Sequence, residues 1–205
     1  MTKRLKSDIL KIWKGVENML EIYCDVDGVL YDINKHAISI ANEEFHTNYN
    51  YMDNTSWWWD DYTKETGFAN REYFERLLDR KGFFIDGEPI VGAIEGLNKL
   101  HDYGFAIKII TSPHWSSKYM IYERIEWLQK HFSWFNKSKD LILTSNKKLC
   151  DKKGKVLIDD YPHNLTWDEG INICYSQPYN REYKGLRMNS WDELAEYLIE
   201  LEKEF

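Results

Sequence analysis

The sequence predicts an α/β fold in which a parallel β-sheet is covered by helices on both faces. Short apolar runs of strand length alternate along the chain with amphipathic helical patterns, and this alternation is typical of parallel sheets. The 205 residues suit one domain, or one domain with an inserted cap, and a hydrophobic content of 43% is enough for a substantial core.

Five runs are expected to form strands. Their high content of Ile, Val and Leu is typical of strands that are buried on both faces of a parallel sheet. In chain order they are EIYCDVD (21–27), FAIKIITS (105–112), LILT (141–144), KVLIDD (155–160) and INICYS (171–176).

The gaps between and after these runs carry helical patterns. In residues 116–132 the spacing points Met120, Ile125, Leu128 and Phe132 towards a core. Further helices are expected within residues 89–104 and 190–205, the last opening with a serine cap and acidic residues in its first turn.

The segment after the first strand has helical character and poor strand signals. We therefore expect a core domain made of residues 1–32 and 89–205, and a helical cap subdomain made of residues 33–88.

Composition narrows the classes of function. The net charge of -7 argues against a nucleic-acid polymer as partner, because phosphate contacts need clustered Lys and Arg. The three Cys, an odd number without a close pair, are expected to be reduced. We see no signal peptide and no apolar run of the roughly 20 residues that span a bilayer, so we expect a cytoplasmic protein.

Polar residues stand at the carboxyl ends of four predicted strands, where ligands of open α/β sheets bind. They are Asp25-Val26-Asp27-Gly28, Thr111-Ser112-Pro113, Thr144 with Ser145-Asn146-Lys147-Lys148 after it, and Asp159-Asp160. Close carboxylates repel each other, and a divalent cation is the usual compensation. The acids therefore predict a Mg²⁺ site, the hydroxyl and ammonium groups predict phosphate binding, and one carboxylate is free to attack phosphorus.

These motifs, in this order, resemble the haloacid dehalogenase (HAD) superfamily of phosphatases. The chain further resembles the 5'(3')-deoxyribonucleotidase family in the pieces DVDGVLYD, GFFIDGEPIVGAIEGLNKL, IKIITSP, YERIEWLQKHF, LILTSNK, VLIDD and NSWDEL. The resemblance implies a HAD-like Rossmannoid three-layer sandwich with a small helical cap. It also implies a Mg²⁺-dependent enzyme that removes phosphate from deoxyribonucleoside monophosphates.

The resemblance also implies roles for the first motif. Asp25 would be the nucleophile that forms an aspartyl-phosphate. Asp27 would be the general acid, which protonates the leaving oxygen and then deprotonates the attacking water, and its backbone carbonyl would bind the metal. Gly28 would let the chain turn sharply away from the strand.

The later motifs receive roles in the same way. Thr111 and Ser112 would bind phosphate oxygens, and Lys147 would pair with the phosphate. Lys148 stays open as the alternative, because the spacing to Asp159 is longer than is usual in the family. Asp159 would be a carboxylate ligand of the metal, and Asp160 a second ligand or an orienting neighbour.

Specificity is expected to come from the cap. In the family, aromatic residues in this region stack on the base, and TSWWWDDY supplies Trp57, Trp58 and Trp59. Successive helical residues point about 100° apart, so we expect at least one of the three to pack inward. Ile33 stands where the family has Phe, which leaves the base preference open.

Two other functions stay open. The first is a HAD phosphatase for another small phosphomonoester such as a sugar phosphate, although a sugar has little use for adjacent Trp side chains. The second is a non-catalytic nucleotide-binding module, which would not need Asp27 beside Asp25 as a proton donor. Many such folds dimerise, so a homodimer is a further expectation.

Overall fold

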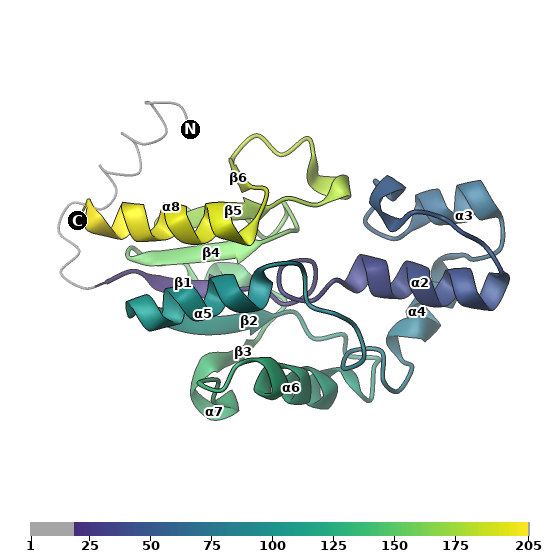
Figure 1. Cartoon of the computed structure of the whole chain (residues 1–205), viewed down its shortest axis with the longest axis horizontal. Helices are drawn as coiled ribbons and strands as arrows, with labels where there is room; N and C mark the ends of the chain where they lie inside the picture. The colour runs from purple at the N-terminus through teal and green to yellow at the C-terminus, as the bar shows by residue number, and fades with distance from the viewer. Residues whose placement is uncertain (1–18, 205) are drawn as a thin grey trace.

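The computed structural model describes residues 19–204 (Figure 1). The first 18 residues of the predicted core domain, including the basic N-terminal stretch in which we see no signal peptide, lie outside the described residues, as does Phe205. Within the described part, no helix has the length and apolar character that a membrane crossing requires.

Within residues 19–204, six parallel strands form one open sheet in the order β3-β2-β1-β4-β5-β6. The strands are β1 (Glu21–Cys24), β2 (Ala106–Thr111), β3 (Leu141–Leu143), β4 (Lys155–Asp159), β5 (Ile171–Tyr175) and β6 (Leu186–Met188). The predicted parallel α/β sheet is confirmed. The sixth strand was not predicted, because its three residues have Arg187 at the centre and form no apolar run.

The helices of the core gather on one face of the sheet (Figure 1). They are α5 (Ala93–Tyr103), α6 (Met120–His131) and α8 (Trp191–Lys203), with the short α7 (Lys137–Asp140) beside β2. Ile22 and Cys24 of β1 belong to the large apolar cluster on this face, and Tyr23 belongs to a smaller one on the other. Among residues 19–204, that second face is covered by Leu165 and Trp167 from the β4–β5 connection, and not by a long helix.

The segment between β1 and α5 is helical, as the sequence indicates. It contains α2 (Ile33–Phe45), the 3₁₀ turn η1 (Tyr51–Asp53), α3 (Asp60–Thr66) and α4 (Arg71–Leu78). These elements share their own apolar cluster, which also includes Met120 of α6. These helices lie to one side of the sheet, on the right in Figure 1, beyond the ends of the strands. The predicted cap limits of 33–88 stay a prediction.

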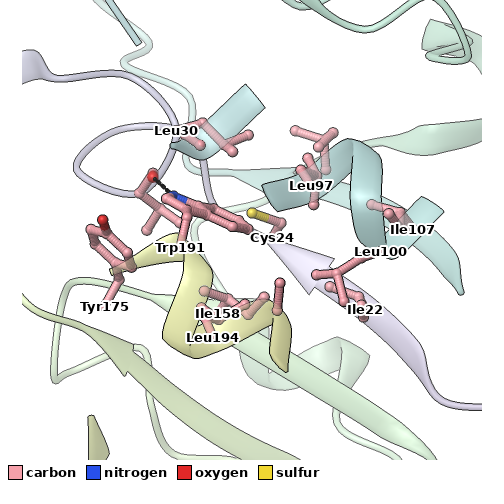
Figure 2. Packing of buried hydrophobic residues seen from close by; sticks show 14 of the residues in the cluster. Ile22, Cys24, Leu30, Leu97, Leu100, Ile107, Ile158, Tyr175, Trp191 and Leu194 are labelled. Carbon is pink, nitrogen blue, oxygen red and sulfur yellow. Dashed lines mark hydrogen bonds between the residues drawn. The ribbon is translucent and has the colours of Figure 1, made fainter. Parts of the chain in front are cut away.

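A buried tryptophan ties the core to the loop that follows β1. Trp191, the first residue of α8, packs near Cys24 and Leu97, and its indole nitrogen donates a 2.9 Å hydrogen bond to the Val29 carbonyl (Figure 2). Ser190 caps this helix by accepting a hydrogen bond from the Glu193 amide, as the sequence predicts. The loop after Asp25 is therefore anchored by the core and not only by its own turn.

Candidate active site

The carboxyl ends of β1, β2 and β4 bring the predicted polar residues together. Asp25 follows β1 directly, Thr111 is the last residue of β2, and Asp159 is the last residue of β4. Since β1 pairs with both other strands in the sheet, residues far apart in the sequence become neighbours. The predicted strand 21–27 in fact ends at Cys24, so Asp25 lies just beyond the sheet.

Lys147 lies between two of these carboxylates. Its Nζ is 2.8 Å from Asp25 Oδ2 and 2.6 Å from Asp159 Oδ2, and its side chain is only 1% exposed. Lys148 is instead 39% exposed and pairs with Asp151 and Asp168. Of the two lysines that the sequence left open, Lys147 is therefore the one in contact with Asp25 and Asp159.

Three buried carboxylates converge beside Lys147. One oxygen each from Asp25, Asp159 and Asp160 lies within 4.8 Å of the others. Asp160 Oδ2 accepts a hydrogen bond from the Tyr179 hydroxyl, but the buried Oδ1 has no hydrogen-bond partner among residues 19–204. A buried oxygen without a partner is costly, and carboxylate oxygens are the ligands that Mg²⁺ prefers. The cluster therefore fits a divalent cation.

Gly28 lies against this cluster with a φ of +74°. A Cβ at this position would be 2.2 Å from Asp160 Oδ2 and 2.8 Å from the Tyr179 hydroxyl. Glycine is therefore needed for two reasons: it tolerates the left-handed conformation, and it leaves room for the carboxylate.

Burial dominates the electrostatics of the cluster. It raises the pKa of Asp25 above its ordinary value, while Lys147 lowers this pKa and Asp159 raises it further. Burial also raises the pKa of Asp160 well above its ordinary value, and Asp159 and Asp25 add to the effect. Burial opposes the charge of Lys147, but Asp159 and Asp25 outweigh it and raise the pKa of the lysine. A cation among these carboxylates would relieve their repulsion.

Asp27 has a different partner. Its Oδ1 accepts a hydrogen bond from Nη2 of Arg124, a buried cation on α6. Burial raises the pKa of Asp27, and Arg124 opposes this shift. The Asp27 side chain is thus separate from the three converging carboxylates.

A cavity of about 320 Å³ lies over these strand ends. It is also lined by the first residues of α2 and by residues 57–59. Most of the predicted site residues line it: Asp25, Asp27, Ile33, Trp57, Trp58, Trp59, Thr111 and Ser112. The remaining three are Lys147, Asp159 and Gly28, which do not line the cavity. Lys147 forms ion pairs with Asp25 and Asp159, and Gly28 lies against Asp160, which also lines the cavity.

The three tryptophans differ in their surroundings. Trp59 is buried, and its indole nitrogen donates a 2.8 Å hydrogen bond to Asn34, so it is the one that packs inward. Trp58 is half-buried under the guanidinium of Arg71. Trp57 is exposed and stacks on Tyr161, which follows β4, with ring centroids 4.1 Å apart. Trp57 therefore connects the helical segment to the loop that follows β4.

The two hydroxyl residues at the end of β2 also differ in exposure. Thr111 is 1% exposed and lines the cavity, whereas Ser112 is exposed and its hydroxyl donates a 3.2 Å hydrogen bond to the Thr144 carbonyl. This bond joins the end of β2 to the end of β3. Both residues are thus at the wall of the cavity next to Asp25.

Comparison with known proteins identifies the family. The model of the family described as "5' nucleotidase, deoxy (Pyrimidine), cytosolic type C protein" matches residues 18–204. The chain belongs to this family. A Bordetella bronchiseptica protein provisionally named 5'(3')-deoxyribonucleotidase is 31% identical over 167 residues, which cover 78% of this chain and 86% of that one. The human mitochondrial 5'(3')-deoxyribonucleotidase is 24% identical over 185 residues, covering 84% and 78%.

Solved structures place this deoxyribonucleotidase-family chain in the HAD fold. A HAD family hydrolase from Deinococcus radiodurans, solved with phosphate and sodium bound, matches 89% of this chain and 96% of its own with a TM-score of 0.56. At 14% identity the likeness is one of fold. The predicted HAD fold, the predicted family and the prediction of a deoxyribonucleotidase-like phosphatase are thus confirmed.

Arg124 and Tyr179, which contact Asp27 and Asp160, are among the residues of the site that were not predicted from the sequence. Arg124 has a signal that could have revealed it: Met120, Trp127 and Leu128 form a buried stripe at helical spacing, and Glu123 and Arg124 occupy its middle. Charged residues in such a stripe need partners inside the protein. Tyr179 has no comparable signal, because its contact with Asp160 depends on how the loop after β5 folds back.

Proposed function

We propose that this protein removes phosphate from deoxyribonucleoside 5'- and 3'-monophosphates, with Mg²⁺ as cofactor and Asp25 as nucleophile. The observation that carries the proposal is a buried acidic cluster with one lysine beneath a cavity lined by tryptophans. The cavity volume falls within the roughly 300–1,000 Å³ of small-molecule sites. Membership of the family, and the names of the relatives, support a deoxynucleotide as substrate.

The metal would be held by the carboxylates of Asp25 and Asp159, the backbone carbonyl of Asp27, and Asp160 through its unpartnered Oδ1. When bound, Mg²⁺ neutralises the repulsion between the Asp25 carboxylate and the phosphate dianion. The Tyr179 hydroxyl orients Asp160 through the other carboxyl oxygen.

The phosphate is bound by the hydroxyl and backbone groups of Thr111 and Ser112, with Lys147 supplying positive charge. The base occupies the part of the cavity next to Trp57 and Trp58, where ring stacking contributes roughly 1–3 kcal/mol per base. Ile33 forms part of the same wall, and its side chain is smaller than the Phe of the family and not aromatic.

The reaction has two steps. In the first, an Asp25 carboxylate oxygen attacks phosphorus, the bond from phosphorus to the nucleoside oxygen breaks, and the Asp27 carboxyl gives its proton to that oxygen. In the second, water attacks the phosphorus of the aspartyl-phosphate and gives a proton to Asp27, and the bond from phosphorus to the Asp25 oxygen breaks. Inorganic phosphate leaves, and both carboxyl groups return to their starting states.

We further propose a cytoplasmic location and a homodimer, with no nucleic-acid polymer as partner. The family description, which includes the word cytosolic, supports the location. The acidic net charge of -7 supports a small phosphorylated ligand over a nucleic acid.

Phosphate release from a substrate panel tests the proposal. The panel contains the deoxynucleoside 5'- and 3'-monophosphates, the ribonucleotides, several sugar phosphates and p-nitrophenyl phosphate, each with Mg²⁺ and with EDTA. We expect release that favours the deoxynucleotides and falls to background in EDTA. Preference for sugar phosphates would overturn the assignment of the cavity, and no release from any substrate would favour a binding module.

A further inference from the structure

Arg124 is an unusual residue in this fold, because it is a cation that is 1% exposed. Its guanidinium uses two different nitrogens: Nη1 donates a 2.9 Å hydrogen bond to the Phe84 carbonyl, and Nη2 donates to Asp27 Oδ1. Nε has no hydrogen-bond partner among residues 19–204. A buried donor left unpaired costs about 1–3 kcal/mol.

The guanidinium is held firmly in place. It lies over the ring of Tyr31 with the Arg124 Cζ 3.9 Å from the ring centroid, and over the ring of Phe84 at 4.8 Å. Tyr31 is itself fixed, since its hydroxyl donates to the Phe83 carbonyl and accepts a 3.0 Å hydrogen bond from the Gly87 amide. Arg124 therefore presents Nη2 to Asp27 from a rigid support.

We infer that Arg124 is a positioning residue for catalysis: it fixes the Asp27 carboxyl group so that the oxygen not bonded to Arg124 serves the substrate. This inference rests on the proposed role of Asp27 as general acid. Asp27 lines the cavity while its Oδ1 is held by Arg124, which leaves Oδ2 for proton transfer.

The hydrogen bond to Arg124 persists through the whole cycle. When Asp27 carries the proton on Oδ2, Oδ1 is a carbonyl oxygen that accepts from Nη2. When the proton has moved to the leaving oxygen, Oδ1 is part of a carboxylate and still accepts. The carboxyl group thus need not reorient between the two steps, which is what preorganisation requires.

A purely structural role for Arg124 is the competing explanation. Through Phe84 it also holds residues 82–84, which lead from the helical segment back to the core. The neighbouring Glu123 holds the same residues, since its carboxylate accepts from the Gly82 amide at 2.7 Å and from the Phe84 amide at 3.1 Å. No hydrogen bond or ion pair joins Glu123 to Asp27 among the described residues, which makes Glu123→Gln a matched control.

The test compares two leaving groups. A nucleoside oxygen must be protonated as it departs, whereas p-nitrophenolate leaves as a stable anion and needs little help. The ratio kcat/KM reports only the steps up to departure of the leaving group, so the later use of Asp27 as a base does not affect it. We measure kcat/KM for the preferred deoxynucleotide and for p-nitrophenyl phosphate in wild type, Arg124→Met, Arg124→Lys and Glu123→Gln.

For Arg124→Met we expect kcat/KM to fall about 100-fold with the deoxynucleotide, the lower end of what a positioned general acid contributes. With p-nitrophenyl phosphate the fall should be only a few-fold. Arg124→Lys should show the same selectivity, with a smaller loss than Arg124→Met because it keeps the positive charge. Some loss should remain, because one ammonium cannot replace both arms of the guanidinium fork. Glu123→Gln should change both substrates by the same factor.

Equal losses for the two substrates in the Arg124 variants would overturn the inference while leaving the proposed function intact. The same holds if Glu123→Gln shows the selective loss. If Arg124→Met does not fold, Arg124→Lys compared with Glu123→Gln decides by the same criterion. A wild-type protein that hydrolyses neither ester would instead overturn the proposed function, and the inference with it.

Discussion

Replacing Asp25 by Asn should abolish turnover and leave the protein folded. An amide cannot attack phosphorus, and removal of a catalytic nucleophile typically lowers kcat by a factor on the order of 10⁴ to 10⁶. The fold should tolerate the change, because it removes one of three converging buried carboxylates and Lys147 keeps its 2.6 Å ion pair with Asp159. Phosphate release under saturating Mg²⁺, together with thermal unfolding, measures both effects.

A surface carboxylate provides the control for this variant. Asp168 is 88% exposed and pairs with Lys148, so Asp168→Asn should leave both activity and the unfolding temperature close to wild type. Near-normal turnover by Asp25→Asn would mean that another residue is the nucleophile. Loss of folding in that variant would contradict the electrostatic description of the cluster.

Replacing Lys147 by Met should reduce both stability and activity. The ammonium lies between Asp25 and Asp159 in a buried site, and removing one partner of a buried ion pair costs about 3–5 kcal/mol because the other charge is left uncompensated. Activity should fall with it, since the phosphate loses its cation. Added Mg²⁺ should raise the unfolding temperature of this variant more than that of wild type, because the metal replaces the missing positive charge.

Lys148→Met is the matched control for that experiment. Lys148 is adjacent in sequence, but its ion pairs with Asp151 and Asp168 involve a side chain that is 39% exposed. Pairs of this kind contribute about 0–1 kcal/mol, so stability and activity should stay near wild type. If Lys148→Met were the damaging change, the assignment of the two lysines would have to be reversed.

The position of the site could be predicted because of the parallel strands. Asp25, Thr111 and Asp159 each follow or end an apolar run, and parallel strands place such ends at one edge of the sheet. The expectation that at least one tryptophan packs inward is met by Trp59, but its helical premise is wrong, because residues 57–59 lie in the turn before α3 and Trp59 has a φ of +59°. These inferences depend on local patterns and on strand direction, both of which the sequence contains.

The contacts between elements could not be predicted in the same way. The helical face chosen for residues 116–132 included Ile125, which is half-buried, and missed Arg124, which is fully buried and reaches Asp27. The second face of the sheet is covered by Trp167 in a connection without helical periodicity, where a helix was expected. In each case the partner comes from a distant part of the chain, and its position depends on the packing of the whole molecule.

The most direct test of the account is to find where the phosphoryl group goes. Excess protein is mixed with a deoxynucleotide that carries a radioactive phosphate, samples are quenched in acid through a single turnover, and the labelled peptide is identified. The account predicts transient label on the peptide that contains Asp25, with none in Asp25→Asn. Label on a different residue, or phosphate release at the wild-type rate from Asp25→Asn, would contradict it.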